Sequence, residues 1–130
     1  MARIILDTNI LIKHWHDQRL RSTVQSPSRW AKVVIHNYGT NYIVTPVRIE
    51  FLSGTRSASE DAMAREFLAE FSVLDKGHIS DRDWQLAEQI ARRVPQNGKP
   101  RQLGDCLVLA IAKRFGCAIV SADKIVKRGR

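Results

Sequence analysis

Apolar residues along this chain form short runs that are separated by amphipathic stretches. Four of the runs are rich in β-branched residues and short enough to be buried strands. They are Ile4–Leu6, Tyr42–Val44, Val73–Leu74 and Ala118–Val120. Because these strands alternate with helical patterns, we expect an α/β fold, a three-layer arrangement in which helices cover both faces of a short, mostly parallel sheet of four or five strands. The length of 130 residues suggests a single domain spanning residues 1–130.

Polar residues and prolines mark where helices begin. Two starts pair a capping residue with a proline in the first turn, and two have the spacing of a capping box. In chain order these starts are Ser26-Pro27, Thr45-Pro46, Ser57–Glu60 and Ser80–Asp83. We further expect a short helix from Asn9 to about His14, followed by a polar loop or irregular helix over residues 15–25, and a helix over Leu103–Phe115 that stops at Gly116.

Two of the predicted helices have a clear apolar face. The Ser57 helix would bury Ala64, Phe67, Leu68 and Phe71, and the Ser80 helix would bury Trp84, Ala87, Ile90, Ala91 and Val94. The stretch 95–102 contains Pro, Asn-Gly and two basic residues, which predicts an exposed basic loop.

The chain is strongly basic, with a formal net charge of +8 and a sequence pI of about 10.1. This balance favours a polyanionic partner, either nucleic acid or an acidic protein segment, although it also serves solubility. Cys106 and Cys117 form no metal-binding pattern and are expected to be buried thiols of a cytoplasmic protein. We see neither a signal peptide nor an apolar run long enough to span a membrane.

Four acidic residues stand where a parallel α/β fold brings distant segments together. Asp7 follows the first strand, Glu50 lies in the helix after the second strand, Asp105 opens the Leu103 helix, and Asp123 follows the fourth strand. Ligands of open α/β sheets bind at the carboxyl ends of the strands. Four carboxylates at that edge would repel one another unless cations lay between them, and all-oxygen ligand sets suit Mg²⁺ or Mn²⁺.

Each acid also has an ordinary structural interpretation. Asp7 can cap a helix, Glu50 can lie on an exposed helical face, and Asp105 and Asp123 can be first-turn and turn residues. Asp75 follows the third strand and is expected to be a turn residue, and Asp83 a first-turn charge. His14 and His16 do not form a metal pair, because side chains at i and i+2 diverge on a helix.

Four segments of the chain resemble the motifs of PIN-domain nucleases. They are Ile4–Ile12 with its hydrophobic-Asp-Thr-Asn core, Thr45–Gly54 with its glutamate, Gly104–Gly116 with its leading aspartate, and Val120–Asp123. Their order and spacing agree over nearly the whole chain, and its size is similar to that of VapC-type toxins of toxin–antitoxin pairs. The family usually continues with an Asp-Phe pair and an edge strand. Here a basic tail, Lys124–Arg130, follows instead, which predicts a missing or vestigial fifth strand.

The resemblance implies a Mg²⁺- or Mn²⁺-dependent ribonuclease that cleaves RNA by attack of water at phosphorus. It also implies a homodimer and a small antitoxin protein as partner. By carry-over, Asp7, Glu50, Asp105 and Asp123 are metal ligands, and Thr8 and Ser121 occupy the family's hydroxyl positions. Two other functions fit the same residues: a non-catalytic PIN-like module that binds RNA or an acidic protein, and a nuclease that acts on DNA structures.

Overall fold

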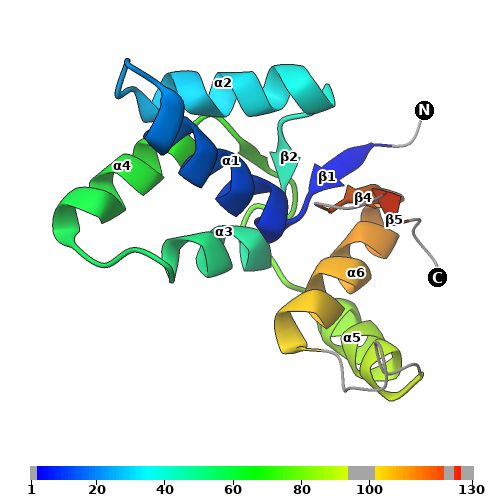
Figure 1. The fold of residues 1–130 in the computed structure, drawn as a ribbon. Coiled ribbons are helices and arrows are strands. Elements are labelled where there is room, and N and C mark those ends of the chain that lie inside the picture. Colours follow the sequence, from blue (N-terminus) through cyan, green and yellow to red (C-terminus); the bar gives the residue numbers. More distant parts are fainter. Residues whose placement is uncertain (1–2, 94–101, 122–124, 127–130) are drawn as a thin grey trace.

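The computed structural model describes residues 3–93, 102–121 and 125–126. Helices and strands alternate along the chain, as Figure 1 shows. In order they are β1 (Ile4–Leu6), α1 (Thr8–Arg21), α2 (Pro27–Tyr38), β2 (Tyr42–Ile43), α3 (Thr45–Leu52), α4 (Ala58–Leu68), β3 (Ser72–Val73), α5 (Asp81–Arg93), α6 (Leu103–Phe115), β4 (Ala118–Val120) and β5 (Ile125–Val126).

The strands form one sheet in the order β3-β2-β1-β4-β5. The first four are mutually parallel, with Ile5 opposite Tyr42 on one side and opposite Ile119 on the other. The predicted α/β fold with a mostly parallel sheet is therefore confirmed. A fifth strand is present but only two residues long, and it runs antiparallel to β4.

The direction in which the chain builds the sheet reverses at β1. From β1 it proceeds to β2 and β3 on one side, and it returns to add β4 on the other. This is a topological switch point, where the connections leaving adjacent strands diverge and open a crevice at the carboxyl ends. Asp7 is the residue that directly follows β1. The topology thus places this carboxylate at the edge where α/β proteins bind ligands.

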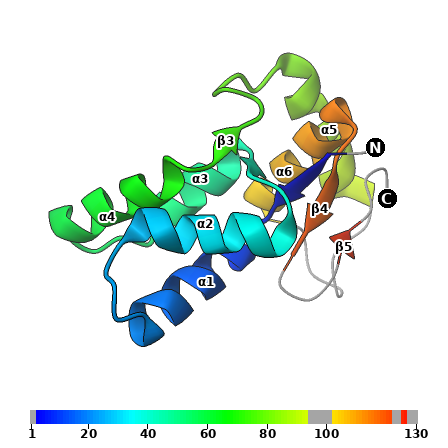
Figure 2. The same cartoon turned by 90° about the horizontal axis from the view of Figure 1, so that it is seen from above.

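Four helices pack together around a cluster of aromatic side chains. Trp15 of α1 lies edge-on to Trp30 of α2, to Phe51 of α3 and to Phe67 of α4, with ring centroids 5.2–5.5 Å apart. All four side chains are buried, so each helix contributes one aromatic ring to the same core. Helices α5 and α6 pack on each other, and α6 also contacts α3 of this group (Figures 1 and 2).

The first helix is longer than predicted. We expected it to end near His14, but α1 continues to Arg21 through a segment predicted as a loop or irregular helix. The polar appearance of this segment is misleading, because Trp15 extends the buried stripe of Ile10 and Leu11 by one more turn. Arg19 forms an ion pair of 2.8 Å with Glu60, which joins the polar face of α1 to α4.

The predicted N-cap residue of α3 is wrong. Thr45 was expected to be the capping residue, but Val44 occupies that position and supplies no side-chain hydrogen bond. Instead, Asp75 Oδ1 accepts a hydrogen bond of 2.8 Å from the backbone N–H of Thr45, and Thr45 Oγ1 accepts one from the N–H of Gly77. The cap therefore comes from the segment after β3, which local sequence patterns do not indicate.

The other predicted caps are confirmed. Ser26, Ser57 and Ser80 each accept a backbone hydrogen bond from the residue three positions later, and Gly116 ends α6 in the left-handed conformation. Gly39 ends α2 in the same way. The buried residues predicted for α4 and its end, Ala64, Phe67, Leu68 and Phe71, are all buried.

Helix α5 is rotated relative to the prediction. Trp84 was expected to be buried but is 47% exposed, whereas Asp83 is 1% exposed. Asp83 turns inward because its carboxylate accepts hydrogen bonds from the N–H of Ser80 and from Arg114 Nε, at 2.9 Å each. Ala87 is buried as predicted, Ile90 is partly buried, and Ala91 is exposed. Val94 and the predicted loop 95–102 lie outside the described residues, apart from Gln102.

Cys106 and Cys117 are both buried, as expected. Within the described part of the chain, no helix combines the length and the apolarity that crossing a bilayer requires.

Candidate active site

A hollow of about 210 Å³ lies at the carboxyl end of β1. Its walls come from three helices that are far apart in the sequence: the first turns of α1, the middle of α3 and the start of α6. The lining residues are Asp7, Thr8, Asn9, Ile12, Glu50 and Asp105. Three carboxylates separated by 43 and 55 positions in the chain, at 7, 50 and 105, thus share one small space.

Asp7 is held on both sides by backbone hydrogen bonds. Its N–H donates to the carbonyl of Val120 in β4 at 2.9 Å, which ties it to the neighbouring strand. Its Oδ1 accepts from the N–H of Thr8 at 2.8 Å, so the carboxylate also caps α1. The structural and the functional interpretations of this residue therefore do not exclude each other.

Glu50 reaches the hollow from α3. Its neighbour Phe51 is anchored in the aromatic cluster, while Ile49 on the other side is 60% exposed. The Glu50 Oε1 atom accepts a hydrogen bond from the hydroxyl of Thr8, which is 5% exposed. This bond fixes the carboxylate beside Asp7.

The start of α6 closes the third side of the hollow. A Cβ atom placed on Gly104 would lie 3.9 Å from Glu50 Oε2, so the glutamate carboxylate approaches the first turn of this helix. Asp105 lies in the same turn. Unsatisfied N–H groups make a helix N-terminus favourable for negative charge, which helps to offset the repulsion between the two acids.

The electrostatics of the hollow show that its acids interact. Burial raises the pKa of Asp7, and the negative charges of Asp105 and Glu50 raise it further. The hydrogen bond from the Thr8 amide acts in the opposite direction. A carboxylate held in this way gains from a cation placed nearby, because the cation relieves both the desolvation and the repulsion.

The donor set suits a hard divalent cation, since it consists of oxygen atoms only. Within the described ranges, however, no three His, Cys, Asp or Glu side chains stand close enough together to form a metal-binding group. The residues of the hollow therefore fit a Mg²⁺ or Mn²⁺ site in three respects: they offer oxygen donors, they share one location, and they carry negative charge. The described side chains do not form a preformed coordination shell.

The structure brings four of the six predicted site residues to one hollow: Asp7, Thr8, Glu50 and Asp105. Asp123 lies outside the described residues. Ser121 follows β4 and does not line the hollow. Asp75 is a turn residue, as expected, and its carboxylate caps α3.

Two residues of the hollow were not predicted, Asn9 and Ile12. Both lie on the side of α1 that Asp7 caps, at two and five positions beyond the aspartate. The helical spacing from Thr8 could have found Ile12, which lies four positions after Thr8 and three after Asn9, because residues three to four apart lie on the same face of a helix. Asn9 adds an amide to the acidic lining and Ile12 an apolar wall.

The described residues form two larger hollows elsewhere. One, of about 510 Å³, lies between α5 and α6, and another, of about 290 Å³, lies between α1, α3 and α4. We assign the chemistry to the smallest of the three because only there do several acids converge on the switch point of the sheet.

A model of a known protein family, described as PIN domain, matches residues 4–130. The match runs through all three carboxylates of the hollow, and it also includes Asp123 and the tail.

Proposed function

Because the chain belongs to the PIN-domain family, whose members are typically nucleases, we propose that it is a metal-dependent endoribonuclease. The observation that carries the proposal is the convergence of Asp7, Glu50 and Asp105 on one hollow at the switch point. The net charge of +8 supports a polyanionic substrate, which would be held by basic surface around the acidic centre.

The proposed roles follow from the position of each residue. Asp7, Glu50 and Asp105 would hold the metal ion, with Asp123 as the fourth ligand suggested by the family motif. A Mg²⁺ or Mn²⁺ ion, when bound, activates water and neutralises charge on the leaving oxygen. The Thr8 hydroxyl orients Glu50, and Ser121 has the corresponding role next to Asp123 by family resemblance alone.

The decisive experiment is cleavage of a mixed RNA pool by the purified protein in Mg²⁺, in Mn²⁺ and in EDTA. We expect cutting in either metal and none in EDTA. The Asp7→Asn protein, prepared in parallel, controls for contaminating nucleases, and its cleavage rate should fall by about 100-fold or more, because metal-ion stabilisation is worth several kcal/mol. Cutting by this variant at the wild-type rate would refute the assignment of Asp7.

One observation favours a second candidate, a PIN-like module that binds RNA or an acidic protein without cutting. It is the lack of a metal-binding group of three acids among the described residues. Titration of Mn²⁺ separates the two candidates. The nuclease requires binding that is lost in a Glu50→Ala protein, whereas a pure binding module would bind RNA equally well with and without the metal.

RNA as the substrate is itself part of the proposal. The same acids would serve a nuclease that recognises DNA structures. Single-stranded RNA, single-stranded DNA and branched DNA should therefore compete in one cleavage assay, in which we expect RNA to be cut preferentially. If branched DNA were cut preferentially, the proposed substrate would be DNA instead of RNA, and the proposed metal chemistry would be unchanged.

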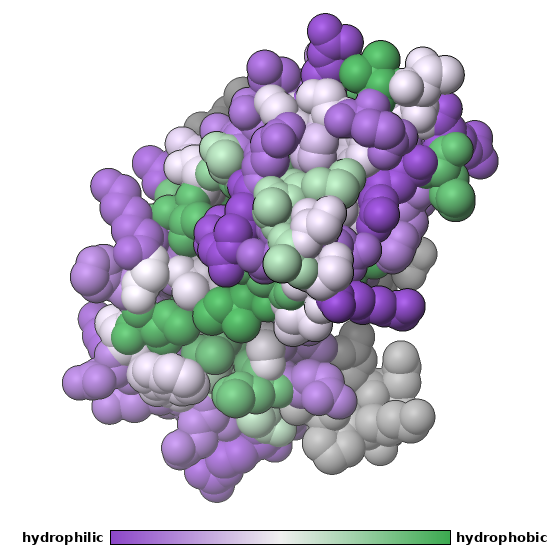
Figure 3. Space-filling view, turned by 90° about the vertical axis from the view of Figure 1, so that its left-hand side faces the viewer, coloured by the Kyte–Doolittle hydropathy of each residue, from purple (hydrophilic) through white to green (hydrophobic). Residues whose placement is uncertain are grey.

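We further propose that the protein is the toxin of a type II toxin–antitoxin pair, with a small antitoxin as its partner. A second hollow beside the site supports a protein partner, because it shares Ile12 with the acidic hollow and includes Trp15, Phe51 and Ala64. On the side of the molecule where α4 lies, hydrophobic residues gather among hydrophilic ones (Figure 3). A partner segment could fill this hollow and direct an Arg or Lys at the carboxylates.

Expression of the protein alone should arrest growth, and co-expression of the protein encoded beside it should restore growth and co-purify with it. Absence of both effects would count against the toxin assignment. The homodimer, predicted from the family resemblance, is tested by measuring the mass in solution. The cytoplasmic location likewise stays a prediction.

A further inference from the structure

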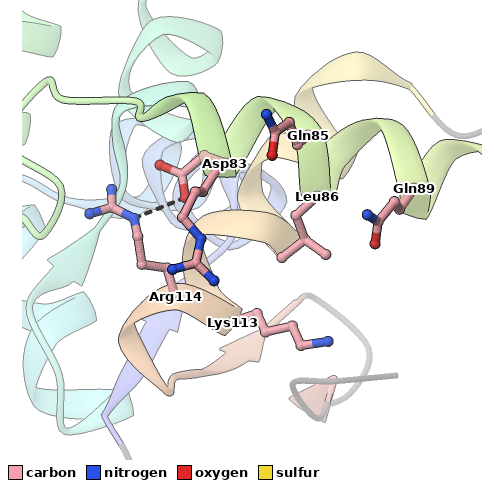
Figure 4. Close-up of a pocket in the computed structure, with 7 residues that line it drawn as sticks. Asp83, Gln85, Leu86, Gln89, Lys113 and Arg114 are labelled. Atoms are coloured by element: carbon pink, nitrogen blue, oxygen red, sulfur yellow. Dashed lines mark hydrogen bonds and ion pairs between the residues drawn. The ribbon is translucent and has the colours of Figure 1, made fainter.

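The largest hollow described above lies away from the carboxylates and is lined mainly by basic and amide side chains. It is formed where α5 and α6 pack on each other, and it has a volume of about 510 Å³. The lining residues are Arg82, Asp83, Gln85, Leu86, Gln89, Lys113 and Arg114. Figure 4 shows Gln89 and Lys113 extending from the two helices on either side of the gap, with Leu86 between them.

The charges in this hollow do not cancel. Three cations face one acid, Asp83, and that acid is already engaged by Arg114 Nε and by the N–H of Ser80. Neither Arg82 nor Lys113 makes an ion pair with any residue that the structure describes. Both are exposed, and they come from different helices. The hollow therefore presents two uncompensated positive charges.

Arg114 is fixed in place as the third cation. It donates to Asp83 and to the carbonyl of His78, at 2.9 and 3.0 Å, and its guanidinium lies 4.4 Å from the centre of the Phe115 ring. One third of the side chain is still exposed. A cation that is held this firmly loses little side-chain entropy when it meets an anion.

We propose that this hollow binds the phosphate backbone of a nucleic-acid strand, at a position distinct from the acidic site. The proposal rests on the proposed function in one respect, since it takes the strand to be the RNA substrate. Arg and Lys supply the charge that phosphates require, and the Gln85 and Gln89 amides can donate to phosphate or sugar oxygens. Leu86 gives the hollow an apolar floor, which suits a ribose or a base better than a free phosphate ion.

The position of the hollow determines what it would do for the enzyme. Lys113 lies eight residues after Asp105 on the same helix, which corresponds to roughly 12 Å along the axis of α6. A strand held in the hollow would be anchored a few nucleotides from the bond that is cut. The hollow would thus add affinity for longer RNA and fix the register of the strand without contacting the reacting phosphate.

The test compares two double variants that remove the same charge. Arg82→Gln/Lys113→Gln changes the hollow, and Arg29→Gln/Lys32→Gln changes two exposed cations of α2, which lies well apart from α5 in Figure 1. Binding of a fluorescent single-stranded RNA is measured in EDTA over a range of salt concentrations. Equal thermal midpoints for all three proteins show that folding is unchanged.

We expect the hollow variant to bind RNA more weakly, on the order of tenfold. The magnitude of the slope of log K against log salt should fall by about 1.4, since each of the two lost phosphate contacts contributes about 0.7 for a single strand. The α2 variant should bind nearly as the wild type does. Equal losses in both variants would overturn the proposal. So would RNA binding that is unchanged in the hollow variant while binding of polyglutamate is lost, because that result indicates an acidic protein partner.

The two proposals fail in different ways. Wild-type protein that binds RNA through the hollow but never cuts it would refute the nuclease and leave the phosphate site standing. Wild-type protein that cuts RNA, while both double variants bind RNA equally, would refute the phosphate site and leave the nuclease standing.

Discussion

The hydroxyl of Thr8 donates a hydrogen bond to Oε1 of Glu50, which joins the start of α1 to the helix that follows β2. The two residues are 42 positions apart in the chain. Thr8 also donates its N–H to Asp7, so a single residue contacts two of the carboxylates in the candidate active site. This arrangement makes Thr8 the group that sets their relative positions.

Replacing Thr8 by Val should therefore reduce RNA cleavage more than it reduces stability. Valine has nearly the same shape but no hydroxyl, so Glu50 loses its partner while the backbone bond to Asp7 remains. We expect cleavage to fall by about 10- to 100-fold, as is typical when a group that orients a metal ligand is lost. Thr8→Ser keeps the hydroxyl and should retain most of the rate. Equal rates for the Val and Ser variants would refute the role of the hydroxyl.

The Asp7→Asn variant should be more stable than the wild type in EDTA at neutral pH. Asn caps a helix about as well as Asp, so the cap of α1 is kept while a partly buried charge that other acids repel is removed. The melting temperature at pH 7 should rise by a few degrees. A lower melting temperature than that of the wild type would contradict this account of the site.

The stability difference should also depend on pH. Burial raises the pKa of Asp7 above its usual 3.8, so the folded protein binds the proton more tightly than the unfolded chain. The contribution of Asp7 to stability then falls as the pH rises from 3.8 through the raised pKa, and it stays unfavourable above it. The two proteins should converge in melting temperature below pH 3.8. A constant difference across the titration would rule out this cause.

Divalent metal should stabilise the folded protein through the same acids. A ligand present at 100 times its Kd stabilises a protein by about 2.7 kcal/mol if it binds only the folded state. We expect Mn²⁺ to raise the melting temperature of the wild type and to have little effect on Glu50→Gln. Glu88→Gln removes an exposed carboxylate of α5 and serves as the control. Loss of the effect in the control as well would indicate non-specific binding.

Asp75 should stabilise α3, because it supplies the only side-chain cap that the described residues give to the start of this helix. Asp75→Ala should lower the free energy of unfolding in urea by about 1 kcal/mol, the usual cost of a lost cap. Asp75→Asn keeps an acceptor for the Thr45 N–H and should lose less. Since α3 carries Glu50, cleavage should fall in the alanine variant too. An alanine variant as stable as the wild type would contradict the capping role.

Arg114→Met should be strongly destabilising. It would leave the carboxylate of Asp83, which is 1% exposed, without its cation. Removing one partner of a buried ion pair costs about 3–5 kcal/mol, and the partial exposure of Arg114 places this case near the lower end. Adding Asp83→Asn to the variant should restore part of the loss in urea unfolding. If Asp83→Asn instead lowered the free energy of unfolding by a further full increment, the two residues would be acting independently.

Local patterns in the sequence determined most of the secondary structure. A serine N-cap and a C-terminal glycine with positive φ each act within a single helical turn. The roles of Ser57 and Gly116 could therefore be predicted without knowledge of the fold. The order and spacing of four acidic motifs likewise indicated the family and a shared site, because each acid follows a predictable element. Three of these acids, Asp7, Glu50 and Asp105, line one hollow in the structure, and their role as metal ligands stays a prediction.

Only the tertiary structure decided which long-range partners those residues acquire. The cap of α3 comes from Asp75, the inward turn of Asp83 from Arg114, and the orientation of Glu50 from Thr8. These contacts join residues 30 to 42 positions apart, so no local pattern contains them. Burial and hydrogen bonding across the core override the local preference of a residue, as the exposed Trp84 and the buried Asp83 show.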